Sequence, residues 1–115
     1  MALHEKIDQL VTKLMVLTEA GKVTWDATAD EDTFLTTLGK FVVTLKKEER
    51  HFGAERYNAF RFKILDAGGK ALEEAYEVTQ TNDWERLRTL HDLARRKALH
   101  VEEALSDLLA SLEHI

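Results

Sequence analysis

Residues 33–46 read TFLTTLGKFVVTLK, and this stretch decides the fold. Two runs rich in β-branched and aromatic residues, 33–38 and 41–46, lie on either side of Gly39-Lys40. Glycine in the first central position of a two-residue turn adopts the positive φ that a type II′ hairpin requires. The register that this turn imposes gives one almost wholly apolar face, formed by the pairs Leu38 with Phe41, Thr36 with Val43, and Phe34 with Leu45. The stretch therefore predicts an antiparallel hairpin with one buried face.

Further strands are predicted on both sides of this hairpin. Residues 57–66 alternate as a third strand would, whereas the link before them, residues 47–56, carries charges of both signs and contains Gly53, which indicates a solvated loop. Residues 70–78 fit a helix or a strand; we favour a short edge strand, because the glycine turn before them sets up a hairpin. Residues 23–25 (Val-Thr-Trp) could add a further short strand.

An amphipathic helix is predicted over about residues 3–20. Charged residues take one side of this segment, and its apolar residues have helical spacing on the other. Gly21 follows at the position where a left-handed residue closes a helix. The apolar stripe comprises Leu3, Ile7, Leu10, Leu14 and Leu17, widened by Val11.

The C-terminal third carries one apolar stripe that never loses helical phase: Trp84, Leu87, His91, Ala94, Ala98, Val101, Leu105, Leu108 and Leu112. Thr81-Asn82-Asp83 supplies capping residues before it. An unbroken helix of about 30 residues would be roughly 45 Å long; it would overhang the sheet and expose the stripe unless a second chain covered it. Charge favours a break near Leu99–Val101, because Arg95–Lys97 suit a helix C-terminus and Glu102-Glu103 suit a new N-terminus. We favour the break slightly, since it would let the last helix fold back onto the core.

Together these elements predict a single α+β domain over residues 1–115. The fold comprises an N-terminal helix, a three- to four-stranded antiparallel β-meander, and one or two C-terminal helices packed on one sheet face. The expected core is Leu10, Leu14, Leu17, Trp25, Phe34, Leu38, Phe41, Val43, Leu45, Phe60, Phe62, Ile64, Trp84 and Leu87.

Composition narrows the function classes. The chain has 115 residues, a net charge of -5 and no cysteine, which excludes disulfides, thiolate nucleophiles and cysteine-type zinc sites. It opens without a basic segment followed by an apolar run, and no stretch approaches the roughly 18 apolar residues of a membrane span. We therefore expect a cytoplasmic protein with no signal peptide and no membrane association.

No residue pattern indicates catalysis, a cofactor or a metal. The acidic loop containing Asp26, Asp30, Glu31 and Asp32 lacks the alternate spacing around a glycine that calcium loops use. The five histidines show no ligand spacing, and His91 on the apolar stripe is expected to be a partly buried, hydrogen-bonded side chain. We therefore expect no enzyme activity.

Several segments carry a resemblance. These are GKVTWDAT at residues 21–28, the hairpin that begins at Thr33-Phe34, residues 57–69, and LHDLARRKA at residues 90–98. Together they resemble a pattern in small uncharacterised bacterial proteins, in which a helix, a tryptophan-led β-meander and a C-terminal helix follow one another. The resemblance implies this order of elements and a bacterial source. It implies no activity and no site.

The most interpretable candidate surface lies on the last helix, at Val101, Leu105, Leu108, Leu109 and Leu112. Segment 82–99 is rich in Arg and Lys, whereas segment 101–115 has four acidic residues and neither Lys nor Arg. Two antiparallel copies would therefore bring basic halves against acidic halves. The sequence indicates a protein-interaction module that binds a protein partner or its own copy. The alternative is a small acidic regulator or inhibitor from a phage or mobile element.

A weaker candidate is a basic patch formed by Arg86, Arg88, Arg95, Arg96 and Lys97. Such cations beside Trp84 could contact phosphates and stack on bases. Trp84 belongs to the apolar stripe, however, and the net charge of the chain is negative. Nucleic acid is therefore the less favoured partner.

Overall fold

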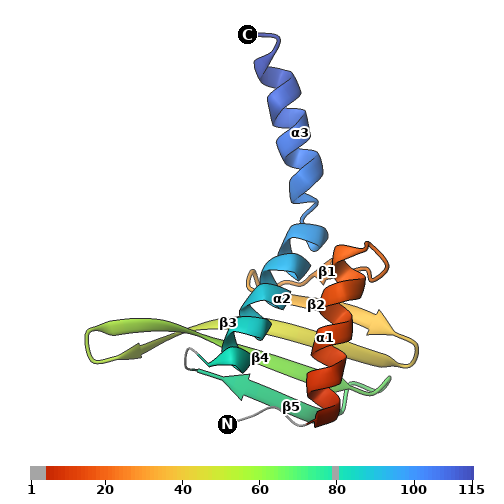
Figure 1. The fold of residues 1–115 in the computed structure, drawn as a ribbon, viewed down its shortest axis with the longest axis vertical. Coiled ribbons are helices and arrows are strands. Elements are labelled where there is room, and N and C mark those ends of the chain that lie inside the picture. Colours follow the sequence, from red (N-terminus) through yellow and green to blue (C-terminus); the bar gives the residue numbers. More distant parts are fainter. Residues whose placement is uncertain (1–4, 79–80) are drawn as a thin grey trace.

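Five antiparallel strands form one sheet in the computed structural model, which describes residues 5–78 and 81–115, and two helices cover one face of this sheet (Figure 1). The strands follow one another in the sheet in chain order: β1 Asp26–Ala27, β2 Thr33–Leu38, β3 Phe41–Phe52, β4 Glu55–Leu65 and β5 Ala71–Glu77. The α+β meander is confirmed, whereas the expectation of three or four strands is wrong, because the described residues form five.

The hairpin predicted from residues 33–46 forms in the expected register. Leu38 pairs with Phe41, Thr36 with Val43 and Phe34 with Leu45. Gly39 has φ 61°, and His100 is the only non-glycine residue with positive φ in the described ranges, so Lys40 has the negative φ of a type II′ turn. Turn chemistry and side-chain pattern therefore act together to fix this pairing.

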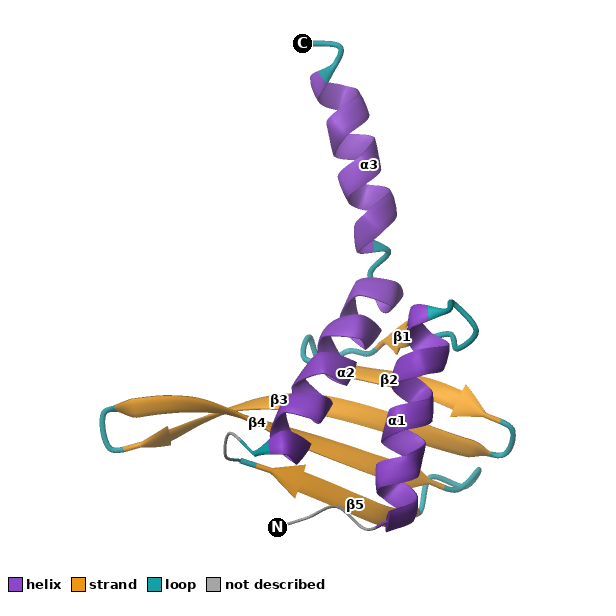
Figure 2. Ribbon diagram, in the orientation of Figure 1, coloured by secondary structure: helices purple, strands orange, loops and turns teal. Residues whose placement is uncertain are grey.

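The sequence predicted a solvated loop at residues 47–56, but the structure shows two strands there instead. β3 continues to Phe52 and β4 begins at Glu55, with a second tight turn at Gly53, φ 62°. Beyond the paired parts of β2 and β5 the two strands project as a two-stranded ribbon (Figure 2), here called the arm, residues 48–59. The helices do not cover its outer end, so most of the arm's side chains stay exposed while the backbone ladder continues.

Of the two edge strands, β5 agrees with expectation and β1 differs from it. β5 confirms the edge strand favoured over residues 70–78. β1 is displaced, because it comprises Asp26–Ala27 rather than residues 23–25. Val23 and Trp25 instead bury their side chains in the core, with 8% and 3% of their surface exposed.

Helix α1, Glu5–Glu19, packs on the sheet through Ile7, Val11, Leu14 and Thr18. This face is rotated from the predicted stripe, since Leu10 is half-buried and Leu17 is exposed. Gly21 closes the helix with φ 73°, and the Lys22 N–H donates to the Leu17 carbonyl, as expected of a left-handed C-terminal residue. The predicted start of this helix, with Leu3, lies outside the described residues.

Helix α2, Asn82–Ala98, crosses the same face of the sheet beside α1 (Figure 1). Thr81 caps it by accepting a hydrogen bond from the Trp84 backbone N–H. Its buried residues are Trp84, Leu87, Leu90, His91 and Ala94. The expected core is confirmed except for Leu17 and Phe41, both 37% exposed, and for Leu10, Leu38 and Ile64, which are partly buried at its rim.

Helix α3, Val101–Leu112, is separate from α2, which confirms the predicted break. His100 lies between them in the left-handed region, with φ 53° and ψ 46°. The expectation that the last helix folds back onto the core is wrong. It projects away from the sheet and from both other helices (Figure 1), and none of its residues is buried.

Candidate functional site

The apolar stripe of α3 is open to solvent along its length. The exposed fractions are 46% for Leu105, 57% for Leu108, 65% for Leu109 and 56% for Leu112, while Val101 is half-buried. Residues 101, 105, 108 and 112 are four, three and four apart, the spacing of a and d positions in a heptad repeat. The structure thus brings the five candidate interface residues together on one unpartnered helix.

The junction between α2 and α3 directs this helix away from the domain. Two backbone hydrogen bonds end α2: the Leu99 N–H donates to the Arg95 carbonyl, and the His100 N–H donates to the Lys97 carbonyl. Left-handed backbone at His100 then changes the chain direction, and the Ala104 N–H returns to the His100 carbonyl to begin α3. An ion pair between Arg96 and Glu102 spans the bend.

Charge is unevenly divided across the junction. Helix α3 carries Glu102, Glu103 and Asp107 and no cation. The last turn of α2 carries Arg95, Arg96 and Lys97, and within the described ranges neither Arg95 nor Lys97 makes an ion pair. The molecule therefore presents an acidic helix beside a basic turn, as the sequence indicated.

The five cations of the proposed basic patch do not share one surface. Arg86 turns toward α1, where it pairs with Asp8 and donates to Thr12. Arg88 pairs with Glu85 at 2.9 Å and lies over the Trp84 ring, and Arg96 is held by Glu102. Trp84 itself is buried, and its indole N–H donates to the Asn58 carbonyl at 2.7 Å.

Two of these cations line a shallow hollow of about 420 Å³ between α2 and the base of the arm. Lys47, Arg88 and Arg95 contribute positive charge there, and Asp92 contributes negative charge. His91 also lines this hollow, which does not unite the five predicted cations.

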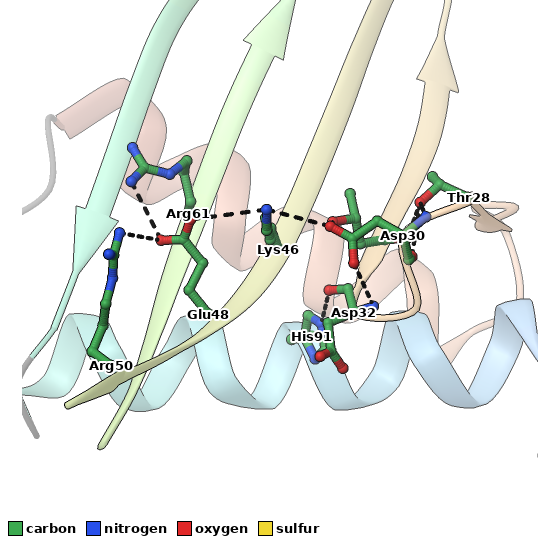
Figure 3. Close-up of polar contacts among 9 residues, drawn as sticks. Thr28, Asp30, Asp32, Lys46, Glu48, Arg50, Arg61 and His91 are labelled. Carbon is green, nitrogen blue, oxygen red and sulfur yellow. Dashed lines mark hydrogen bonds and ion pairs between the residues drawn. The ribbon is translucent and has the colours of Figure 1, made fainter. Parts of the chain in front are cut away.

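His91 is held inside the core. Its imidazole is 4% exposed and lies edge-on to Phe34, with ring centroids 5.3 Å apart, and 5.6 Å from Phe60. The Nε2–H donates to the Asp32 carbonyl at 2.8 Å, which ties α2 to the loop before β2 (Figure 3). Burial lowers the pKa of His91 below its ordinary value, with a smaller opposing effect from the hydrogen bond. The prediction of a buried, hydrogen-bonded histidine is confirmed.

The sheet face opposite the helices carries a ladder of charges that sequence reasoning missed. Glu48 accepts from Arg50 at 3.2 Å and Arg61 at 3.3 Å, and Lys46 lies 3.3 Å from Asp30 (Figure 3). Burial raises the pKa of Glu48, but the two arginines together outweigh this effect and leave it lowered. Residues 46–50 are all charged, so charge does not alternate in the sequence; only the strand assignment, with its two-residue period, places residues 46, 48 and 50 on one face of β3.

Arg61 extends this ladder to β5. It pairs with Glu74, and its guanidinium lies 4.2 Å from the centroid of the Tyr76 ring. The Arg50 Nε–H donates to the Tyr76 hydroxyl at 2.9 Å. Because these charges are paired with one another, the open sheet face is a less suitable apolar docking surface than α3.

The acidic loop is occupied by its own contacts. Asp30 accepts from the Asp32 N–H at 3.1 Å and the Thr33 hydroxyl at 2.9 Å. These hydrogen bonds and Lys46 lower the pKa of Asp30. In the part of the chain that the structure describes, no three histidine or acidic side chains are grouped to hold a metal ion, and no helix is long and apolar enough to cross a bilayer.

Comparison with known proteins gave no relative. The chain matches no protein-family model, and it matches neither a curated protein nor a solved structure. The resemblance to small bacterial proteins therefore stays a prediction.

Proposed function

We propose that this protein is a protein-interaction module whose docking element is α3. The supporting observation is an apolar stripe that the chain itself leaves uncovered, on a helix that buries none of its residues. Exposed leucines scattered singly need no explanation, but Leu105, Leu108, Leu109 and Leu112 are contiguous on one short helix. Amphipathic helices commonly bind through such a stripe, with anchors three and four residues apart.

The other candidate surfaces support this choice. Most of the predicted basic patch is used in contacts with α1, Glu85 and Glu102, which weakens the case for nucleic acid. His91 is the only buried histidine among the described residues, and it donates a hydrogen bond to the Asp32 carbonyl. This contact gives the imidazole a structural role. The apolar face of α3, by contrast, has no partner within the described part of the chain.

Affinity capture tests the proposal with three baits: the wild type, Leu105→Glu/Leu108→Glu, and Val16→Glu. Val16 is a matched control, because it is 61% exposed on α1, far along the chain from the stripe. We expect the wild type and Val16→Glu to retain a stoichiometric protein, a second copy of the chain included, and the double variant to lose it. Equal retention by all three baits, or none by any, would refute a docking role for α3.

A further inference from the structure

We propose that the partner of α3 is a second copy of this chain, bound antiparallel, with Val101 of each copy against Leu112 of the other and Leu105 against Leu108. This inference rests on the proposed docking role of α3. It adds the identity of the partner and the register of the contact.

The stripe is symmetric about its own centre. Val101 and Leu112 lie equally far from the point between Ser106 and Asp107, and so do Leu105 and Leu108. A copy turned end over end therefore presents the same apolar positions in the same places. This self-complementarity is what a two-fold dimer requires, because both copies use one patch.

Charge selects the same orientation. In the antiparallel register each carboxylate of α3 lies level with an uncharged residue of the second copy: Glu102 with Ser111, Glu103 with Ala110, and Asp107 with Ser106. Glu102 flanks the apolar stripe, whereas Glu103 and Asp107 lie on the outer side of the helix. In a parallel pair Glu102 would instead lie level with the Glu102 of the second copy, and like charges at the edge of a contact oppose association. The antiparallel pair avoids this repulsion.

The ends of the helix add attraction. The register brings Glu113 of one copy level with His100 of the other, next to the basic last turn of α2. Arg95 and Lys97 of this turn make no ion pair within the described part of the chain, so they are available to an incoming carboxylate. Acidic and basic segments thus meet across the two-fold axis, as the charge asymmetry of the sequence indicated.

The size of the contact sets the strength of the dimer. Helix α3 has 12 residues, about 18 Å of helix, and its four leucines are each about half exposed. A standard protein interface buries about 800 Å² per partner. The stripe supplies less than this, so we expect a dimer that dissociates on dilution.

Engineered disulfides test the orientation, since the chain contains no cysteine of its own. We would prepare Val101→Cys and Leu112→Cys separately, oxidise each alone, and oxidise an equal mixture. In the antiparallel dimer, positions 101 of the two copies lie roughly 16 Å apart, beyond the ~7 Å between Cα atoms that a disulfide can bridge. We expect cross-linking in the mixture only, between one copy of each variant; cross-linking of each variant to itself would overturn the antiparallel register.

Light scattering over a concentration series tests the partner. We expect the wild type and Val16→Glu to pass from monomer to dimer as concentration rises, and Leu105→Glu/Leu108→Glu to stay monomeric while still showing the cooperative urea unfolding of an intact domain. A wild type that stays monomeric up to millimolar concentration would overturn the second copy as partner. If the capture experiment then still retains another protein through α3, the docking role stands and only this inference fails.

Discussion

Protonation of His91 should make the stability of the fold depend on pH. The imidazole is 4% exposed between two phenylalanines, and burial lowers its pKa in the folded state. In the unfolded chain its pKa returns to about 6.5. As pH falls through that value the unfolded chain binds the proton first, so the free energy of unfolding falls until the lower folded pKa is reached. The stability that His91 contributes is thus present above about pH 6.5 and lost below it.

The magnitude is bounded by one proton. A single group changes the free energy of unfolding by at most about 1.4 kcal/mol per pH unit between its two pKa values. Urea unfolding of the wild type and His91→Gln between about pH 5 and pH 8 isolates this contribution, because glutamine can still donate to Asp32 but does not titrate. His51→Gln, an exposed position on the arm, is the matched control. If wild type and His91→Gln lose stability in parallel as pH falls, the argument from burial is wrong.

Three further substitutions test single contacts. Thr18→Val removes the hydroxyl that accepts the Trp25 indole N–H at 2.9 Å, and leaving this donor unpaired in the core should lower the free energy of unfolding by about 1–3 kcal/mol in urea titrations; adding Trp25→Phe should recover part of the loss. His100→Gly should raise the free energy of unfolding by about 1 kcal/mol, because glycine adopts left-handed backbone without strain. An unchanged free energy of unfolding would contradict this. Thr81→Ala deletes the cap on the Trp84 N–H and should cost about 1 kcal/mol, measured by thermal unfolding against Thr89→Ala, whose hydroxyl bonds within the same helix.

The central hairpin could be predicted because two independent signals agree. The Gly39 turn and the alternation of apolar residues specify the same register, so each excludes the slips that the other would allow. In the arm only the turn signal remains. Gly53 marks it, but neither face of its outer end is covered by a helix, and no apolar alternation indicates a strand. Hydrophobic periodicity predicts a strand only where one of its faces is buried, so it does not predict the exposed outer part of the arm.

The buried face of α1 shows a second limit. Thr18 occupies a core position that apolar spacing assigned to its neighbour Leu17. Its hydroxyl is satisfied by Trp25, seven residues on and beyond the Gly21 bend. A polar residue can be buried when its partner is buried with it. The partner comes from tertiary structure, which the local pattern of a helix does not contain.

The sequence identified the residues of the apolar stripe on α3, but it did not predict that these residues stay exposed to solvent. Phase alone would continue one helix through His100, and the charges at Arg95–Lys97 and Glu102-Glu103 indicated the break correctly. Neither signal states where the second helix goes. The same stripe would fit a helix that packs on the core or one that projects from it. Amphipathic spacing predicts that one face of a helix is apolar, but it does not identify the surface that buries this face.

The helicity of α3 is itself an argument for a partner. Isolated helices shorter than about 12–15 residues are marginal in water, because most helical stability in proteins comes from packing an apolar face. Helix α3 has 12 residues, buries none of them, and begins at a left-handed residue that gives it no side-chain cap. The domain therefore supplies little that would hold this segment helical, while Leu105, Leu108 and Leu112 align only when it is helical. Docking of the stripe supplies the missing packing, so that binding and the ordering of α3 are one process.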